Sequence, residues 1–171
     1  MKHWQYQNPV AIHFGAGVLE TLPKLLGGRR ATLVTFPEAR QFGLLPRLQK
    51  LLGESLAGVI DNTQPNPDVD GLDALYREFW KTPDACEVIV AVGGGSALDT
   101  AKALMVGTES GEFDALVALL APDKPFTPHR IKSLLAVPPT SGTGREVTGW
   151  ATDLPKAAGH VDSPPQHQTS P

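Results

Sequence analysis

The feature that most constrains the fold of this chain is a short apolar run that ends in three consecutive glycines. Residues 87–92 read Glu-Val-Ile-Val-Ala-Val, Gly93-Gly94-Gly95 follows, and a helical pattern begins at once. An almost continuously apolar, β-branched run is typical of a central parallel strand that is covered on both faces. A strand of this kind that leads directly into a helix predicts an α/β fold around a parallel sheet.

The rest of the chain alternates in the same way between short apolar runs and helical patterns. Strands are predicted at residues 10–14, 31–36, 56–60, 87–92 and 131–137. Helices are predicted at residues 19–26, 46–52, 69–80, 96–106 and 113–120, with Asp68 as a cap of the third. The predicted fold class is therefore α/β, a Rossmann-like parallel sheet with flanking helices.

The pattern changes after Val137, where residues 138–144 form a polar, glycine-containing loop. From about residue 151 the chain has no apolar periodicity and ends in a segment rich in proline, glutamine and histidine. Such a segment cannot contribute to a packed core. We predict one nucleotide-binding α/β domain over residues 1–150 and a disordered tail over residues 151–171.

Charge and cysteine content exclude several classes of protein. The 171-residue chain has 15 lysines and arginines and 18 acidic residues, which gives a net charge of −3. It therefore lacks the basic surface of a nucleic-acid binder. No apolar run approaches the roughly 20 residues that cross a bilayer, and the N-terminus lacks the apolar core of a signal peptide. A single cysteine, Cys86, cannot form an internal disulfide. We therefore expect a soluble protein of a reducing, cytoplasmic compartment.

The glycine loop after residue 92 has the context of a phosphate site. Glycine backbone can approach a ligand closely, and the free amides and positive dipole at the start of the next helix favour a phosphate or pyrophosphate. The spacing differs from the dinucleotide fingerprint, because Leu98 stands where glycine or alanine is needed. For Ser96 and Asp99 alone, an alternative explains the pattern equally well: Ser96 as helix cap and Asp99 as its capping-box partner.

A second loop also follows a predicted buried strand, so both loops should open at the same edge of the sheet. Its hydroxyl groups could bond a ribose, a phosphate or a nicotinamide amide, and they belong to Thr140, Ser141 and Thr143. Taken alone, this loop could be an ordinary connection. Two such loops at one edge favour a nucleotide-binding cleft.

The two glycine motifs together resemble the iron-containing (group III) alcohol dehydrogenases. The motifs are residues 93–102, Gly-Gly-Gly-Ser-Ala-Leu-Asp-Thr-Ala-Lys, and residues 138–148, Pro-Pro-Thr-Ser-Gly-Thr-Gly-Arg-Glu-Val-Thr. The resemblance extends over about residues 8–150. It implies an N-terminal nucleotide-binding domain, a following helical domain that holds Fe²⁺ or Zn²⁺, and NAD(P)-linked interconversion of a small alcohol and its aldehyde.

The resemblance also implies roles for individual residues. Gly94, Gly95 and Ser96 would hold the pyrophosphate of the nicotinamide dinucleotide. Asp99 would lie near its nicotinamide end, with Lys102 supporting that region. The second loop would line the nucleotide with Thr140, Ser141 and Thr143.

Three positions depart from the family pattern. Phe36 ends the second predicted strand, where members that prefer NAD commonly have an aspartate. This departure leaves room for NADP, with Arg40 near its 2′-phosphate. Arg145 replaces a small serine and Gly149 replaces a proline, and a long cation beside the second loop could obstruct the cleft.

The resemblance places the family's metal ligands, an aspartate and several histidines, in a helical half that has no counterpart in this sequence. His160 and His167 lie in the predicted tail and are not expected to replace them. We therefore expect a member of an enzyme family that is inactive on its own, or, alternatively, a non-catalytic nucleotide-binding fragment or an inactive truncated gene product. A subunit that pairs with a separate metal domain is a third hypothesis. The face left uncovered predicts self-association.

Overall fold

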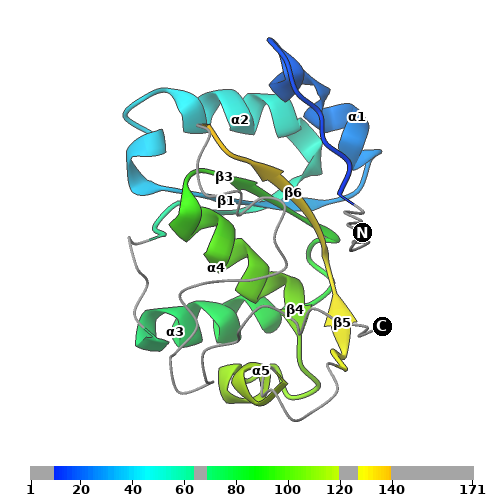
Figure 1. Ribbon diagram of the computed structural model, residues 1–171, viewed down its shortest axis with the longest axis vertical. Helices are drawn as coiled ribbons and strands as arrows, with labels where there is room; N and C mark the ends of the chain where they lie inside the picture. Colours follow the sequence, from blue (N-terminus) through cyan, green and yellow to red (C-terminus); the bar gives the residue numbers. More distant parts are fainter. Residues whose placement is uncertain (1–9, 64–68, 120–126, 140–171) are drawn as a thin grey trace, which may run out of the picture.

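A four-stranded parallel sheet forms the centre of the structure (Figure 1). The structure is a computed structural model that describes residues 10–63, 69–119 and 127–139. The strand order is β2-β1-β3-β6, with β1 at Ala31–Thr35, β2 at Leu56–Ile60, β3 at Val88–Val92 and β6 at Ser133–Val137. Each neighbouring pair is parallel. The predicted α/β fold around a parallel sheet is confirmed.

The order of the strands creates a topological switch point between β1 and β3. The chain passes from β1 to β2 on one side, then returns across the sheet so that β3 lies on the other side of β1. The connecting helices are α2 (Leu44–Leu52), α3 (Val69–Trp80), α4 (Gly95–Met105) and α5 (Phe113–Leu119). Open α/β sheets bind ligands at the carboxyl ends of the strands at such a point.

Two hydrophobic clusters cover the two faces of the sheet. Val88 and Val90 of β3 face the cluster that includes α2 and α1 (Leu22–Leu26), whereas Ile89 and Ala91 face the cluster of α3, α4 and α5. Figure 1 shows α1 and α2 on one side of the sheet and the other three helices on the opposite side. Every residue of β3 is buried, as predicted for a strand covered on both faces.

Short 3₁₀ turns and a small second sheet complete the described fold. The 3₁₀ turns are η1 (Val18–Thr21), η2 (Pro37–Ala39) and η3 (Gly53–Ser55). The buried Tyr76 of α3 braces the second sheet: its hydroxyl donates to Val106 O at 2.7 Å and accepts from Thr108 N at 3.2 Å. Burial raises the pKa of this hydroxyl, which keeps it protonated as a donor.

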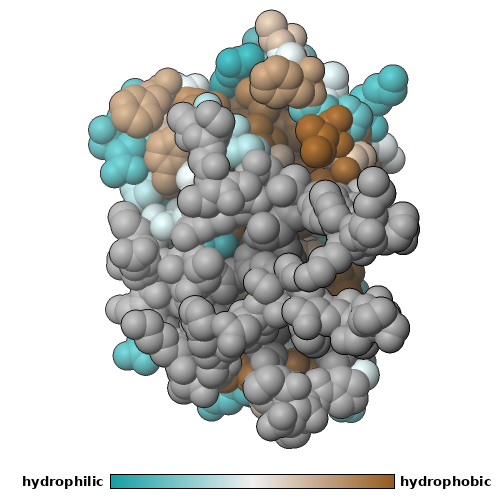
Figure 2. All heavy atoms as spheres, viewed as in Figure 1, coloured by the Kyte–Doolittle hydropathy of each residue, from teal (hydrophilic) through white to brown (hydrophobic). Residues whose placement is uncertain are grey.

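The predicted strand at residues 10–14 is wrong. This segment has no strand structure, and the edges of the main sheet are β2 and β6. Val10, Ile12 and Phe14 are 44%, 72% and 99% exposed. Alternating apolar residues predict which side chains share a face, but a strand also needs a neighbouring backbone to pair with. Figure 2 shows hydrophobic side chains among hydrophilic ones at the end of the molecule that holds α1.

The predicted strand at residues 131–137 is divided in two. β5 (Arg130–Ile131) pairs antiparallel with β4 (Val106–Gly107), and only after Lys132 does β6 join the main sheet. Lys132 N donates to Met105 O at 2.8 Å, while its side chain turns into the interior and is 7% exposed. The pattern of side chains along a run does not reveal that the backbone changes its partner strand within it.

Two further predictions concern segments beyond the described residues. Residues 140–144 of the second glycine loop and residues 151–171 of the predicted tail lie outside the described ranges. The domain boundary at residue 150 stays a prediction for the same reason. No helix within the described ranges is long and apolar enough to cross a membrane.

Candidate functional site

The glycine loop joins the carboxyl end of β3 to the first turn of α4. The N-cap of α4 is Gly94, with φ −74° and ψ −166°, and no side chain caps the helix. The alternative in which Ser96 caps the helix with Asp99 is therefore wrong, because the helix begins at Gly95, before Ser96 is reached. With glycine at the N-cap, the free amides of the first turn are left for a ligand rather than for a side-chain oxygen.

The first two glycines of the loop have different surroundings. A Cβ placed on Gly93 would lie 2.8 Å from Ala97 Cβ and 3.2 Å from Phe36 Cδ1, so this position is packed. A Cβ placed on Gly94 would meet no atom of the described residues within 4 Å. Gly93 therefore allows β3, α4 and the end of β1 to approach, whereas Gly94 presents bare backbone to space that no described residue fills. That is the arrangement in which a pyrophosphate can come close to the chain.

Two buried threonine hydroxyls fix the carboxyl edge of the sheet. Thr35 Oγ1 donates to Val92 O at 2.8 Å, and Thr63 Oγ1 donates to Thr35 O at 2.9 Å. The first bond joins the end of β1 to the end of β3. The second bond holds the segment after β2 against the end of β1. Sequence reasoning missed both residues; the available signal is the polar Thr35 as the last residue of a buried strand.

β6 brings the second loop to the same edge. Val137, its last residue, is in register with Val92, and Gly93 N donates to Val137 O at 3.3 Å. The chain after Val137 thus leaves the sheet beside the glycine loop, as predicted. Thr140, Ser141 and Thr143 themselves lie outside the described residues, as do Arg145, Gly149, His160 and His167.

Asp99 and Lys102 lie on α4 and are both buried, with exposed fractions of 2% and 8%. Charged side chains are rarely this buried. Three residues apart on a helix, they lie on the same side of it. Thr100 Oγ1, between them in sequence, is buried and has no hydrogen-bond partner among the described residues. The predicted roles of Asp99 and Lys102 toward the nicotinamide stay predictions.

Beyond β1, the carboxyl edge carries two aromatic rings and an ion pair. The rings of Phe36 and Phe42 have centroids 6.4 Å apart. Arg40 Nη2 lies 3.0 Å from Asp61 Oδ2, with the two side chains 67% and 35% exposed. Asp61 is the residue that follows β2, so this pair spans the ends of two neighbouring strands. Sequence reasoning named Phe36 and Arg40 but not Asp61.

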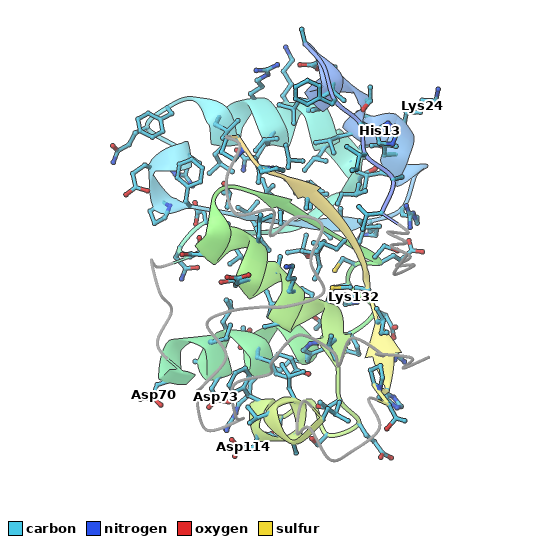
Figure 3. The ribbon with its side chains drawn as sticks, in the orientation of Figure 1. His13, Lys24, Asp70, Asp73, Asp114 and Lys132 are labelled. Carbon is cyan, nitrogen blue, oxygen red and sulfur yellow. The ribbon has the colours of Figure 1, made fainter. Side chains whose placement is uncertain are left out.

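The described residues do not fit a catalytic metal. No group of three or more His, Cys, Asp or Glu side chains that could hold an ion occurs within the described ranges. His13, near α1 in Figure 3, and His129, before β5, are both exposed. Cys86 is buried and forms no disulfide.

A hollow of about 510 Å³ lies away from the glycine loop. Its lining comes from the segment after β4, from α5 and from the approach to β5, including Glu109, Leu119 and His129. None of the glycine-loop residues lines it. The hollow is therefore separate from the carboxyl edge of the sheet.

Comparisons with known proteins agree with this arrangement. The family model for iron-containing alcohol dehydrogenases matches residues 9–160. Choline dehydrogenase of Bacillus subtilis (strain 168) is 35% identical over 157 residues, which are 88% of this chain and 38% of that protein. NADPH-dependent butanol dehydrogenase of Clostridium saccharobutylicum is 33% identical over 84% of this chain and 37% of its own length.

A solved structure matches in three dimensions as well. Sulfoacetaldehyde reductase from Bifidobacterium kashiwanohense, in complex with NAD+, is similar over 86% of this chain and 39% of its own, with a TM-score of 0.71 and 30% identity. The chain thus spans less than two-fifths of the length of these relatives.

Proposed function

This chain belongs to the iron-containing alcohol dehydrogenase family, and we propose that its carboxyl edge binds a nicotinamide dinucleotide, NAD or NADP. The observation that carries the proposal is Gly94, a helix N-cap without a side chain that faces open space at the switch point of the sheet. Free amides and the positive end of α4 suit a pyrophosphate there.

Each predicted residue has a part in this binding. The backbone of Gly94, Gly95 and Ser96 holds the pyrophosphate at the start of α4. Asp99 and Lys102 lie further along the same helix, toward the nicotinamide. The second loop adds the hydroxyls of Thr140, Ser141 and Thr143 from the neighbouring strand end. When bound, the nicotinamide supplies a hydride donor or acceptor.

The reaction we propose for the complete family enzyme is interconversion of a small alcohol and its aldehyde. A choline dehydrogenase, a butanol dehydrogenase and a sulfoacetaldehyde reductase among the relatives support this reaction class. This chain, in our proposal, is the cofactor-binding part and has no turnover alone, since its described residues supply no ligand set for Fe²⁺ or Zn²⁺. A buried, unpaired Cys86 supports a reducing, cytoplasmic location.

A second candidate function is a nucleotide-binding module with no catalytic role. It uses the same carboxyl edge and differs in that the chain then has no part in a complete enzyme. Reduction of an aldehyde by the purified chain, dependent on added Fe²⁺ or Zn²⁺, would contradict both the module and the proposed inactivity. Such turnover would leave cofactor binding intact.

Calorimetric titration of the 171-residue chain with NADH and with NADPH tests the binding itself. We expect saturable binding of at least one dinucleotide. Gly94→Ala places a methyl group where the pyrophosphate approaches and is expected to weaken binding about tenfold. The matched control is Gly58→Ala in β2, whose added Cβ would make an ordinary 3.7 Å contact with Thr32 Oγ1. A folded chain that binds neither dinucleotide contradicts the proposal.

A further inference from the structure

A row of hydrogen bonds crosses the carboxyl edge of the main sheet and passes through the start of the glycine loop. Thr63 Oγ1, in the segment after β2, donates to Thr35 O at the end of β1, at 2.9 Å. Thr35 Oγ1 donates in turn to Val92 O at the end of β3, at 2.8 Å. Gly93 N then donates to the carbonyl of Val137, the last residue of β6, at 3.3 Å. The row therefore ties the glycine loop to both strands that flank β3.

The last two bonds of this row hold a single peptide group, the one that joins Val92 to Gly93. Its carbonyl accepts from Thr35 on the β1 side, and its N–H donates to Val137 on the β6 side. Because a peptide group is planar, it cannot rotate without straining both bonds. The direction in which the chain enters Gly94 is therefore set by a side chain of β1 and by the backbone of β6.

Gly94 depends on this peptide for its own orientation. On the helix side, its carbonyl accepts from Leu98 N at 3.2 Å. On the strand side it follows Gly93, and glycine has more backbone freedom than any other residue. A Cβ placed on Gly94 would meet no atom of the described residues within 4 Å, so packing does not fix it. The peptide between Val92 and Gly93 is thus the nearest group on the strand side that hydrogen bonds hold.

An anion site gains affinity when its donors are fixed before the ligand arrives, because less freedom is then lost on binding. Thr35 can supply this order without reaching a ligand, since its side chain is 0% exposed. Its bond is also shielded, so water does not replace a lost donor. Resting on the proposed function, we propose that Thr35 is a positioning residue for the dinucleotide. Its hydroxyl orients the peptide before Gly94 so that the free amides at the start of α4 meet the pyrophosphate.

Calorimetric titration of the full 171-residue chain with NADH and with NADPH tests this role. Thr35→Val keeps the shape of the side chain and removes the donor. It should weaken both dinucleotides about fivefold, because both have the same pyrophosphate. Thr35→Ser keeps the hydroxyl and should bind within about twofold of the wild type. The titrations are run at a temperature at which melting curves show every variant to be folded.

Thr32→Val is the matched control. Thr32 lies earlier on the same strand, is also buried at 7% exposed, and takes no part in the row of bonds at the carboxyl edge. The chemical change is the same as in Thr35→Val. Both affinities should stay at the wild-type value in this control.

Amide relaxation by NMR in the free chain adds a readout that a loss of global stability does not move. The order parameter of the Gly94 amide should be close to about 0.85, the value of rigid backbone, in the wild type, Thr32→Val and Thr35→Ser. In Thr35→Val it should fall below about 0.6. Thr63→Val breaks the row one bond further from the loop and should weaken both dinucleotides less, about twofold.

Wild-type affinity in a folded Thr35→Val, an equal loss in Thr32→Val, or no rescue by Thr35→Ser overturns the positioning role and leaves the proposed function standing. An unchanged order parameter of the Gly94 amide in Thr35→Val overturns it as well. If Thr35→Val does not fold, wild-type affinity in Thr63→Val overturns it. Failure of the folded wild-type chain to bind either dinucleotide overturns the proposed function itself.

Discussion

The two ends of the sheet each place a cation near a pair of aromatic rings, but in contrasting surroundings. At the carboxyl end, Arg40 is 67% exposed and bonds an exposed carboxylate. At the amino end, Lys132 is 7% exposed (Figure 3). Its Nζ donates to Pro83 O and Cys86 O, each at 2.6 Å, and lies 5.0 Å and 5.6 Å from the ring centroids of Trp80 and Phe79.

The difference separates a cation that holds the fold from one that is available to a ligand. Lys132 has partners that cannot move without the backbone, namely two carbonyl groups and two packed rings. Arg40 has one carboxylate partner among the described residues, in an ion pair that is partly exposed. Buried, fully partnered charges are costly to disturb, whereas exposed pairs contribute little. We therefore interpret the amino end as the structural end of this sheet, and the carboxyl end is the one that we propose binds the dinucleotide.

The largest expected effect is at the amino end. Lys132→Met leaves two carbonyl groups without their donor and should lower the free energy of unfolding by about 3 kcal/mol. Lys81→Met is the matched control, because Lys81 is 68% exposed and pairs only with Glu78. Urea denaturation followed by circular dichroism measures both. Equal losses for the two variants would mean that the buried contacts of Lys132 do not stabilise the fold.

The glycine loop gives the next largest effect. Gly93→Ala brings a methyl group to 2.8 Å from Ala97 Cβ at a φ of +156° and should cost about 2 kcal/mol of stability. The added methyl group of Gly94→Ala meets no atom of the described residues, so this variant should unfold like the wild type while losing affinity for the dinucleotide. Thermal melts and titrations of both variants decide the comparison. If both lose stability to the same degree, Gly94 is a packing residue and not a binding one.

A smaller effect is expected from the hydrogen bond that closes the carboxyl edge. Thr35→Val keeps the shape of the side chain but leaves Val92 O without this donor, which should cost about 1 kcal/mol. Thr21→Val removes an exposed bond to Val18 O, which water can replace, and should cost less. Parallel denaturation curves measure the difference. Identical curves for the two variants would show that the buried bond does not brace the edge.

The smallest effect on stability is expected at Arg40. Arg40→Ala breaks only an exposed ion pair and should change the free energy of unfolding by less than about 0.5 kcal/mol. A thermal melt beside that of Lys132→Met makes the comparison direct. A large loss of stability in Arg40→Ala would show that the ion pair between Arg40 and Asp61 is part of the fold.

Most of the fold follows from local patterns in the sequence. β2 and α3 have the predicted bounds. β1, β3 and α5 differ from prediction by one residue at one end, and α4 differs by one residue at each end. These elements have continuous apolar runs or helical stripes because each is covered by a cluster on the sheet. The segment at residues 10–14 and the division at Lys132 could not be predicted, because both depend on which backbone lies alongside.

In the candidate site, too, some residues could be predicted from local sequence patterns and others could not. Gly94 and the start of α4 are local features, and the sequence is enough to find them. Asp61 and Thr63 belong to the site through contacts with Arg40 and Thr35, more than 20 residues away, that only the crossover of the chain creates. The capping interpretation of Ser96 failed for a smaller reason: α4 starts at Gly95, two residues before the start that a cap at Ser96 requires.

Amide NMR spectra of the chain, recorded with and without NADPH, test the contrast between the two ends most directly. We predict that the amide signals of Gly94, Gly95 and Ser96 shift on binding, together with those of Phe36 and Asp61. Signals of Lys132 and of the Trp80 indole at the amino end should stay in place. Shifts confined to the amino end, or none in a folded chain at saturating NADPH, would contradict the assignment of the carboxyl end as the binding end.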